Sequence, residues 1–265
     1  MLRIPVIPIP VIIVALFAAG PSTASAADEW GDLTLRFVYD GQPPKPQVIL
    51  VDKDRAVCKQ GDIRNESVLV GEEDHGVANV VMWLERMEHD AAMPIHPDYE
   101  KTAKAEVTLT VKNCRYEPRV TLVRSSQTLV LKVLDPIAYS FCAELPRGTL
   151  DVILPAGGVH KEAFTKSDRV PSRVGCRIHA WLQGLLFVHD NPYAATSDAS
   201  GRISFTNLPV GKWQFRLWHE RCGFIRKATL GGKPVEWKFG RLDVEIKPGA
   251  NNLGDVLIKP TSFTE

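Results

Sequence analysis

Apolar and polar residues alternate along most of this chain, beginning at about residue 33. In that first stretch the apolar positions are Leu33, Leu35, Phe37 and Tyr39. A period of two residues places alternate side chains on a buried face, which is the pattern of a half-buried β-strand. The pattern returns at residues 107–111, 120–123, 129–133, 150–154, 185–188, 203–205, 213–217 and 242–246. Short turn-forming stretches separate these segments, so we predict an all-β protein built as a sandwich or barrel.

One segment favours a helix, and one position favours a boundary. Residues 96–105 contain Pro97 at a first-turn position, which predicts a short connecting helix. The composition changes at Asp190-Asn191-Pro192-Tyr193, and two turn-strand units follow it. We therefore place a boundary between subdomains near residue 191.

The N-terminal residues have the pattern of a secretory signal peptide. Arg3 precedes an apolar stretch at residues 4–19, and Ala24-Ser25-Ala26 fits the small-x-small cleavage rule. A membrane-spanning helix is the other interpretation, but prolines interrupt the stretch and it is shorter than the ~20 residues that a crossing needs. We expect cleavage of residues 1–26, export to the periplasm or the medium, and no membrane span in the mature chain.

Charge and length narrow the functional classes. The formal net charge is +1, without long runs of one sign, which argues against a nucleic-acid or membrane-surface partner. Removing 26 residues from 265 leaves 239, enough for one large β domain or two small ones. We find no nucleophile elbow, phosphate-binding glycine loop or zinc-binding helix motif, so we do not expect an enzyme.

The five cysteines are Cys58, Cys114, Cys142, Cys176 and Cys222. An exported chain folds in an oxidising compartment, where cysteines pair if geometry allows. If Cys176 is the one left over, the other four form two disulfides. We predict Cys58 with Cys114 and Cys142 with Cys222, although four cysteines allow three pairings and the sequence does not choose among them.

Cys176 belongs to a Cys-x-x-His pair that leads into an apolar strand. Its partner is His179, and Leu182 follows three residues later. A blue-copper site uses a thiolate and two imidazoles in one plane, with a weak axial thioether supplied shortly after the second histidine. The spacing is therefore that of a copper-ligand loop in which leucine holds the axial position.

The sequence resembles the secreted cupredoxin-like family related to plastocyanin and azurin, including methylamine-utilisation-type proteins. The segments that carry this resemblance are residues 76–84, 96–100, 112–118, 127–130, 155–158 and 218–220, together with the loops at 135–142 and 174–182. The resemblance implies a Greek-key β-sandwich. It also implies that the upstream ligand histidine is replaced by Tyr139 and the axial methionine by Leu182, so that only Cys176 and His179 remain.

These residues leave several interpretations open. Cys142 could complete a metal-ligand set with Cys176 and His179, in which two thiolates and an imidazole would suit zinc or Cu(I). Alternatively, it could form the disulfide with Cys222. Tyr139 turned inward beside the pair would also favour a metal. Cys176 could instead be a buried, inert thiol. We interpret His219 as a core histidine on the face shared with Phe215.

The C-terminal part has a resemblance of its own. Residues 196–205 and 208–213 are similar to a carboxypeptidase-regulatory-like (transthyretin-like) β module, whose opening strand is matched best by residues 31–43. We therefore expect an N-terminal segment at 27–105, a cupredoxin-like core at 106–190, and a smaller β-sandwich module at 191–265 that strand 31–43 could complete.

The leading functional hypothesis is an exported cupredoxin-like protein with a degenerate copper site that could still bind copper or another metal through Cys176 and His179. The alternative is a metal-free binding or structural module of the cell envelope. A redox or envelope protein would be the partner in either case. Trp181 and Trp218 could form its docking patch, although core packing is commoner for tryptophan.

Overall fold

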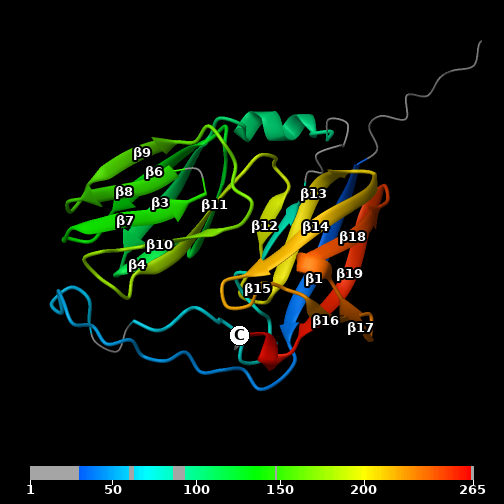
Figure 1. Cartoon of the computed structure of the whole chain (residues 1–265), viewed down its shortest axis with the longest axis horizontal. Helices are drawn as coiled ribbons and strands as arrows, with labels where there is room; N and C mark the ends of the chain where they lie inside the picture. The colour runs from blue at the N-terminus through cyan, green and yellow to red at the C-terminus, as the bar shows by residue number, and fades with distance from the viewer. Residues whose placement is uncertain (1–29, 60–62, 86–92, 147, 264–265) are drawn as a thin grey trace, which may run out of the picture.

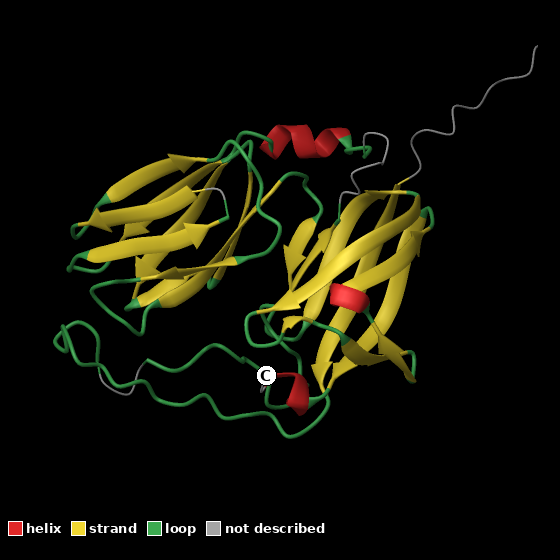
Figure 2. Cartoon of the chain, viewed as in Figure 1, coloured by secondary structure: helices red, strands yellow, loops and turns green. Residues whose placement is uncertain are grey.

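The computed structural model describes residues 30–59, 63–85, 93–146 and 148–263. The expected signal peptide lies outside these residues. In the described part, strands dominate and fold into two β-sandwiches (Figure 2). The chain is therefore all-β and of the sandwich class, as the alternating pattern predicts. No helix in the described ranges is long and apolar enough to cross a membrane.

The first sandwich contains the strands from both ends of the described chain. One sheet has the order β13-β1-β19-β16-β17, and the other has β12-β2-β14-β15 with β18 beside β14. Their bounds are β1 Trp30–Tyr39, β2 Val81–Leu84, β12 Ala194–Thr196, β13 Arg202–Pro209, β14 Gly211–His219, β15 Gly223–Phe224, β16 Lys227–Leu230, β17 Lys233–Glu236, β18 Arg241–Ile246 and β19 Gly249–Ile258. Two 3-10 helices, η2 Lys238–Gly240 and η3 Pro260–Phe263, complete this unit.

Strand β1 joins the two ends of the chain in one sheet. Leu33, Leu35, Phe37 and Tyr39 are buried in the core of the first sandwich, as the alternation predicts. β1 pairs antiparallel with β13 and parallel with β19 (Figure 1). The N-terminal strand thus pairs with strands of the C-terminal segment, which is the pairing that a discontinuous module requires. Membership of that module's family stays a prediction.

The second sandwich is built from the middle of the chain. Its sheets have the orders β5-β11-β10-β7-β8 and β4-β3-β6-β9. The bounds are β3 Glu106–Lys112, β4 Arg115–Glu117, β5 Val120–Arg124, β6 Thr128–Val133, β7 Tyr139–Leu145, β8 Gly148–Leu154, β9 Val159–Ala163, β10 Ser172–Gly175 and β11 Gln183–His189. β3 with β6 and β5 with β11 are parallel pairs in otherwise antiparallel sheets. The predicted connector helix is the 3-10 helix η1 Pro97–Thr102.

An apolar cluster and the chain between β1 and β2 both connect the sandwiches. A small cluster formed by Val81, Trp83, Val120, Leu185 and Phe187 packs strand β2 against strands β5 and β11. The chain between β1 and β2 also leaves the first sandwich, runs below the second and returns (Figure 1). Its residues Val51, Cys58 and Ile63 are buried in the core of the second sandwich. This connecting segment brings residues near 54 to the Cys176 loop.

Candidate functional site

Cys176 and His179 lie together at one end of the second sandwich. Strand β10 ends at Gly175, so the cysteine is the first residue of the loop that leads to β11. The cysteine Sγ and the histidine Nδ1 are 3.9 Å apart, at the outer limit of a sulfur hydrogen bond. The cysteine is 8% exposed and the histidine 0%. The two predicted residues therefore face each other in the interior.

Backbone amides surround the Cys176 sulfur. The N–H groups of Ser140 and His179 donate to Sγ at 3.3 and 3.4 Å, and the Ser140 hydroxyl lies 3.5 Å away. The hydroxyl of Tyr116 in turn donates to the carbonyls of Ser140 and Gly175. These contacts join β7, β4 and β10 around the sulfur, so its position is determined by main-chain hydrogen bonds.

Tyr139 packs beside the pair but points its hydroxyl elsewhere. Its ring centroid is 4.7 Å from that of His179, while its hydroxyl donates to Asp135 Oδ2 at 2.9 Å. The disulfide sulfurs of Cys114 and Cys58 lie 3.2 and 3.6 Å from the same hydroxyl. Burial first, and then the hydrogen bond to Asp135, raise the pKa of Tyr139. The Tyr139 side chain is a neutral phenol, and its O–H group already donates a hydrogen bond to Asp135.

The second ring nitrogen of His179 forms a hydrogen bond with Asp54, a residue that no sequence motif indicates. Nε2 lies 2.7 Å from Asp54 Oδ2. Because a carboxylate accepts, Nε2 carries the hydrogen in the neutral ring, and the Nδ1 lone pair faces Cys176. The Asp54 carbonyl accepts from the N–H groups of Val57 and Cys58, in a turn that the Cys58–Cys114 disulfide attaches to the sandwich.

The remaining members of the predicted loop are part of the packing. Leu182 is buried in the core of the second sandwich, and its N–H donates to the His179 carbonyl at 3.0 Å. Trp181 packs against the His179 ring at 5.1 Å and is partly buried, as is Trp218 at the contact between the sandwiches. The two tryptophans thus belong to different clusters.

The residues do not fit a blue-copper centre. Such a centre needs three strong donors in one plane, and Tyr139 directs its hydroxyl to Asp135. No group of three or more histidine, cysteine or acidic side chains within the described ranges could hold a metal ion. What remains is a row of thiol, imidazole and carboxylate formed by Cys176, His179 and Asp54.

The structure confirms one predicted disulfide and corrects the other. Cys58 and Cys114 are bonded, with Cα atoms 5.6 Å apart. Cys142 and Cys222 are not joined. Cys142 lies on β7 of the second sandwich, where its thiol donates to Asp151 Oδ1 at 3.3 Å, whereas Cys222 packs against the core of the first sandwich. The two positions belong to different units, so the expected pairing was wrong.

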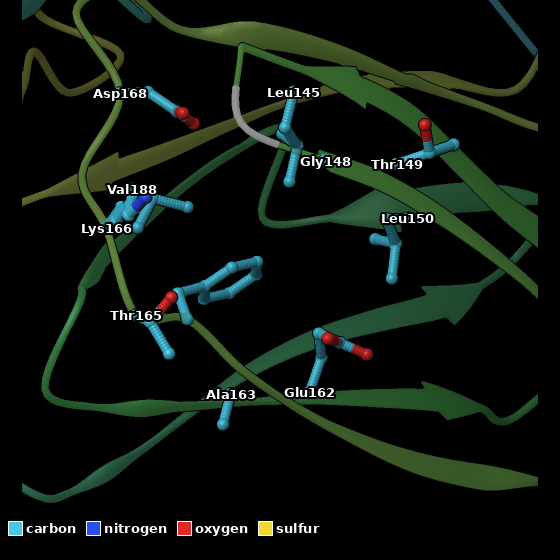
Figure 3. A pocket seen from close by; sticks show the side chains of 11 residues that line it. Leu145, Gly148, Thr149, Leu150, Glu162, Ala163, Thr165, Lys166, Asp168 and Val188 are labelled. Carbon is cyan, nitrogen blue, oxygen red and sulfur yellow. The ribbon is translucent and has the colours of Figure 1, made fainter.

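Two cavities lie away from the Cys176 loop, whereas a third, of about 430 Å³, is lined by Gly175 and Arg177 on either side of Cys176. One of about 130 Å³ lies between the β7–β8 hairpin and the strand and loop around Glu162 and Thr165 (Figure 3). Another of about 650 Å³ lies between the two sandwiches and is lined by side chains from both. None of the residues lining these two cavities belongs to the thiol, imidazole and carboxylate row.

Comparisons with known proteins add little to this description. No family model matches the sequence, and no curated protein matches it. Among solved structures, a mutant amicyanin in the Cu(I) state is 12% identical, with 32% of this chain and 82% of that chain covered and a TM-score of 0.29. An oxidised mutant amicyanin is 14% identical, with 31% and 81% covered and a TM-score of 0.28. Likenesses this weak imply nothing about the chemistry of this chain.

Proposed function

We propose that this chain is an exported, cupredoxin-like protein of the cell envelope whose copper site is degenerate, and that it acts as a metal-free binding module. The observation that carries the proposal is the position of Tyr139. Its phenol packs on His179 and donates to Asp135 at 2.9 Å. A copper centre would need a basic nitrogen in that role, and a neutral phenol with a raised pKa is a poor replacement.

The hydrogen bonds of the cluster support a packing role. Asp135 accepts from the N–H groups of Asn113 and Cys114 at 2.8 Å each, in addition to the tyrosine. Asp54 accepts a hydrogen bond from His179, and the turn that contains Asp54 is attached to the sandwich by the Cys58–Cys114 disulfide. The former ligand loops are thereby joined to the connecting segment between β1 and β2. Such a cluster stabilises the end of the sandwich without a metal.

A second candidate function has an observation of its own. Two donors 3.9 Å apart, the thiol of Cys176 and Nδ1 of His179, can both reach one ion at about 2.0 to 2.3 Å. Asp54 on Nε2 is the kind of carboxylate partner that orients histidine ligands. A thiolate and an imidazole suit a soft ion such as Cu(I). This candidate is a two-donor site for a soft metal, without a fast redox couple.

Copper loading of the purified mature chain tests both candidates. We expect no intense visible absorption with Cu(II) and no copper retained after desalting. Retention of colourless Cu(I), about one ion per chain and lost in Cys176→Ala, would favour the two-donor site instead. Intense blue absorption in the unmodified protein would contradict both candidates.

A gain-of-function variant serves as the positive control. Tyr139→His restores the nitrogen donor at the position that the resemblance assigns to a copper ligand. We expect this variant to retain Cu(II) and to absorb in the visible, while Tyr139→Phe does neither. If Tyr139→His binds no more copper than Tyr139→Phe, the derivation of this site from a copper centre is wrong.

A further inference from the structure

The cavity between the two sandwiches has the features of a small-molecule site. Its volume of about 650 Å³ falls within the range of roughly 300 to 1,000 Å³ that such sites occupy. The first sandwich contributes Trp83, Glu85, Phe224, Phe239 and Arg241, and the second contributes Phe187 and His189. A cavity lined by both units exists only when they are assembled, and sites between domains are common binding positions.

Phe239 is the exposed aromatic ring of the cavity, because Trp83 and Phe187 are only 7% and 1% exposed and the Arg216 guanidinium lies over the Phe224 ring, 5.1 Å from its centroid. Trp83 packs against Phe187 with ring centroids 4.8 Å apart, and Phe224 lies 6.4 Å from the same tryptophan. The Phe239 side chain is 47% exposed, and its backbone is left-handed, with φ of 54°. A bulky residue in that region is uncommon, and strained positions of this kind often occur at binding sites.

An ion-pair network holds the exposed phenylalanine and one arginine in place. Glu85 accepts from Arg216 at 2.6 Å and from Arg241 Nε at 3.1 Å, and Arg216 also donates to the carbonyl of Phe239 at 2.6 Å. Burial acts to raise the pKa of Glu85, but the hydrogen bonds from both arginines outweigh it and lower that pKa. The Glu85 carboxylate therefore stays ionised, and its hydrogen bonds keep Arg216 and Arg241 in place along the cavity.

The charged groups that line the cavity balance one another. The positive charges are those of Arg169, Arg216 and Arg241, and the negative charges are those of Glu85, Asp168 and Asp190. His189 is neutral at physiological pH because burial lowers its pKa to about 4. Its Nδ1–H donates to the Asn191 carbonyl at 2.5 Å, which leaves Nε2 as an acceptor. The site thus offers donors and acceptors without a net charge.

We propose that this cavity binds a neutral oligosaccharide. Sugar rings have apolar C–H faces that pack on aromatic side chains, and hydroxyls that both donate to carboxylates and accept from guanidinium groups. A strongly charged ligand would meet no compensating net charge here. The inference rests on the proposed function as a binding module and names its ligand class.

Isothermal titration calorimetry of the full mature chain tests the assignment. The probes are maltotetraose, cellotetraose and tetra-N-acetylchitotetraose, with tetragalacturonate as the charged comparator. We expect saturable one-to-one binding of at least one neutral probe. Phe239→Asn removes the ring while keeping a residue that tolerates left-handed backbone, and Arg241→Gln removes a cation. Each should weaken binding by about tenfold or more.

The control variant is Ile153→Ala on β8, which is 66% exposed and does not line the cavity. It should bind as the unmodified protein does, and thermal unfolding should show all variants folded. Binding that survives both Phe239→Asn and Arg241→Gln would overturn the cavity assignment but leave a binding module. No binding of any neutral probe at millimolar concentration, or tighter binding of tetragalacturonate, would overturn the ligand class. Neither result bears on the metal-free site, which copper loading tests separately.

Discussion

Buried polar side chains determine the chemistry at the end of the second sandwich. Asp135 is the centre of their hydrogen bonds, because its carboxylate accepts from Tyr139 and from two backbone N–H groups. The contact between Asp54 and His179 joins residues 125 positions apart. A spacing of three residues makes the proximity of Cys176 and His179 predictable, whereas no local pattern indicates Asp54.

Two buried histidines should make the protein sensitive to acid. Burial is the main cause that lowers the pKa of His189 and of His219 from 6.5 to about 4 each. Between these values the unfolded chain binds more protons than the folded chain, so stability is present above pH 6.5 and falls as the pH decreases. The loss approaches roughly 3 kcal/mol for each histidine near pH 4.

Urea unfolding at a series of pH values measures this loss. We expect the free energy of unfolding to decrease between about pH 7 and pH 5. His189→Gln and His219→Gln should each flatten the decrease, since they remove a titrating group. Buried Glu220, whose pKa is raised, acts in the opposite direction and is common to all variants. Equal slopes in the variants and the unmodified chain would contradict the prediction.

Among the elements, β7 shows where sequence pattern and resemblance disagree. The resemblance places residues 135–142 in a ligand loop, but β7 begins at Tyr139. Tyr139, Phe141 and Ala143 are buried on alternate positions, which is the period of a strand. The Tyr139 ring therefore packs on His179 from the first position of a strand rather than from a loop.

The turn before β13 makes a close approach that only glycine allows. Gly201 has φ of 78°, and its carbonyl accepts from the N–H of Phe37 at 2.8 Å. A Cβ on Gly201 would lie 2.1 Å from the Phe37 carbonyl oxygen. Gly201→Ala should therefore lower the free energy of unfolding by at least about 2 kcal/mol, through backbone strain and overpacking together.

Gly231→Ala is the matched control for this prediction. Gly231 has φ of 57°, but a Cβ there would meet nothing within 4 Å. In this variant the free energy of unfolding should decrease only by the cost of backbone strain, about 1 kcal/mol. Chemical denaturation of both variants gives the comparison. Equal losses would mean that the close approach to β1 is not a constraint.

At the scale of the whole molecule, a buried ion pair links the two sandwiches. Arg119, just before β5, donates to both carboxylate oxygens of Glu220, at 2.6 and 2.9 Å. Glu220 lies in the turn between β14 and β15, and its side chain is 8% exposed. Glu66 of the connecting segment lies 3.7 Å from the same arginine. One guanidinium group thus joins both units and the segment between them.

Removing the charge of Glu220 should loosen the assembly. Glu220→Gln leaves Arg119 buried without its main counter-ion, and breaking such a pair costs about 3 to 5 kcal/mol. We expect a lower melting temperature and a broadened or split calorimetric transition, because the sandwiches would unfold less cooperatively. Glu245→Gln on the exposed face of β18 is the control and should change neither. A single, unshifted transition in Glu220→Gln would show that the apolar contact alone couples the units.

The sequence by itself determined the class of the fold and part of the site. Alternation of apolar residues is a local property, so segments such as β1, β14 and β18 follow from it directly. The spacing of Cys176 and His179 is equally local. Only the tertiary structure decided that Asp54 binds His179, that Cys142 and Cys222 lie in different units, and that side chains from both sandwiches line one cavity. Those outcomes depend on contacts between residues far apart in the chain, which packing selects and no short pattern encodes.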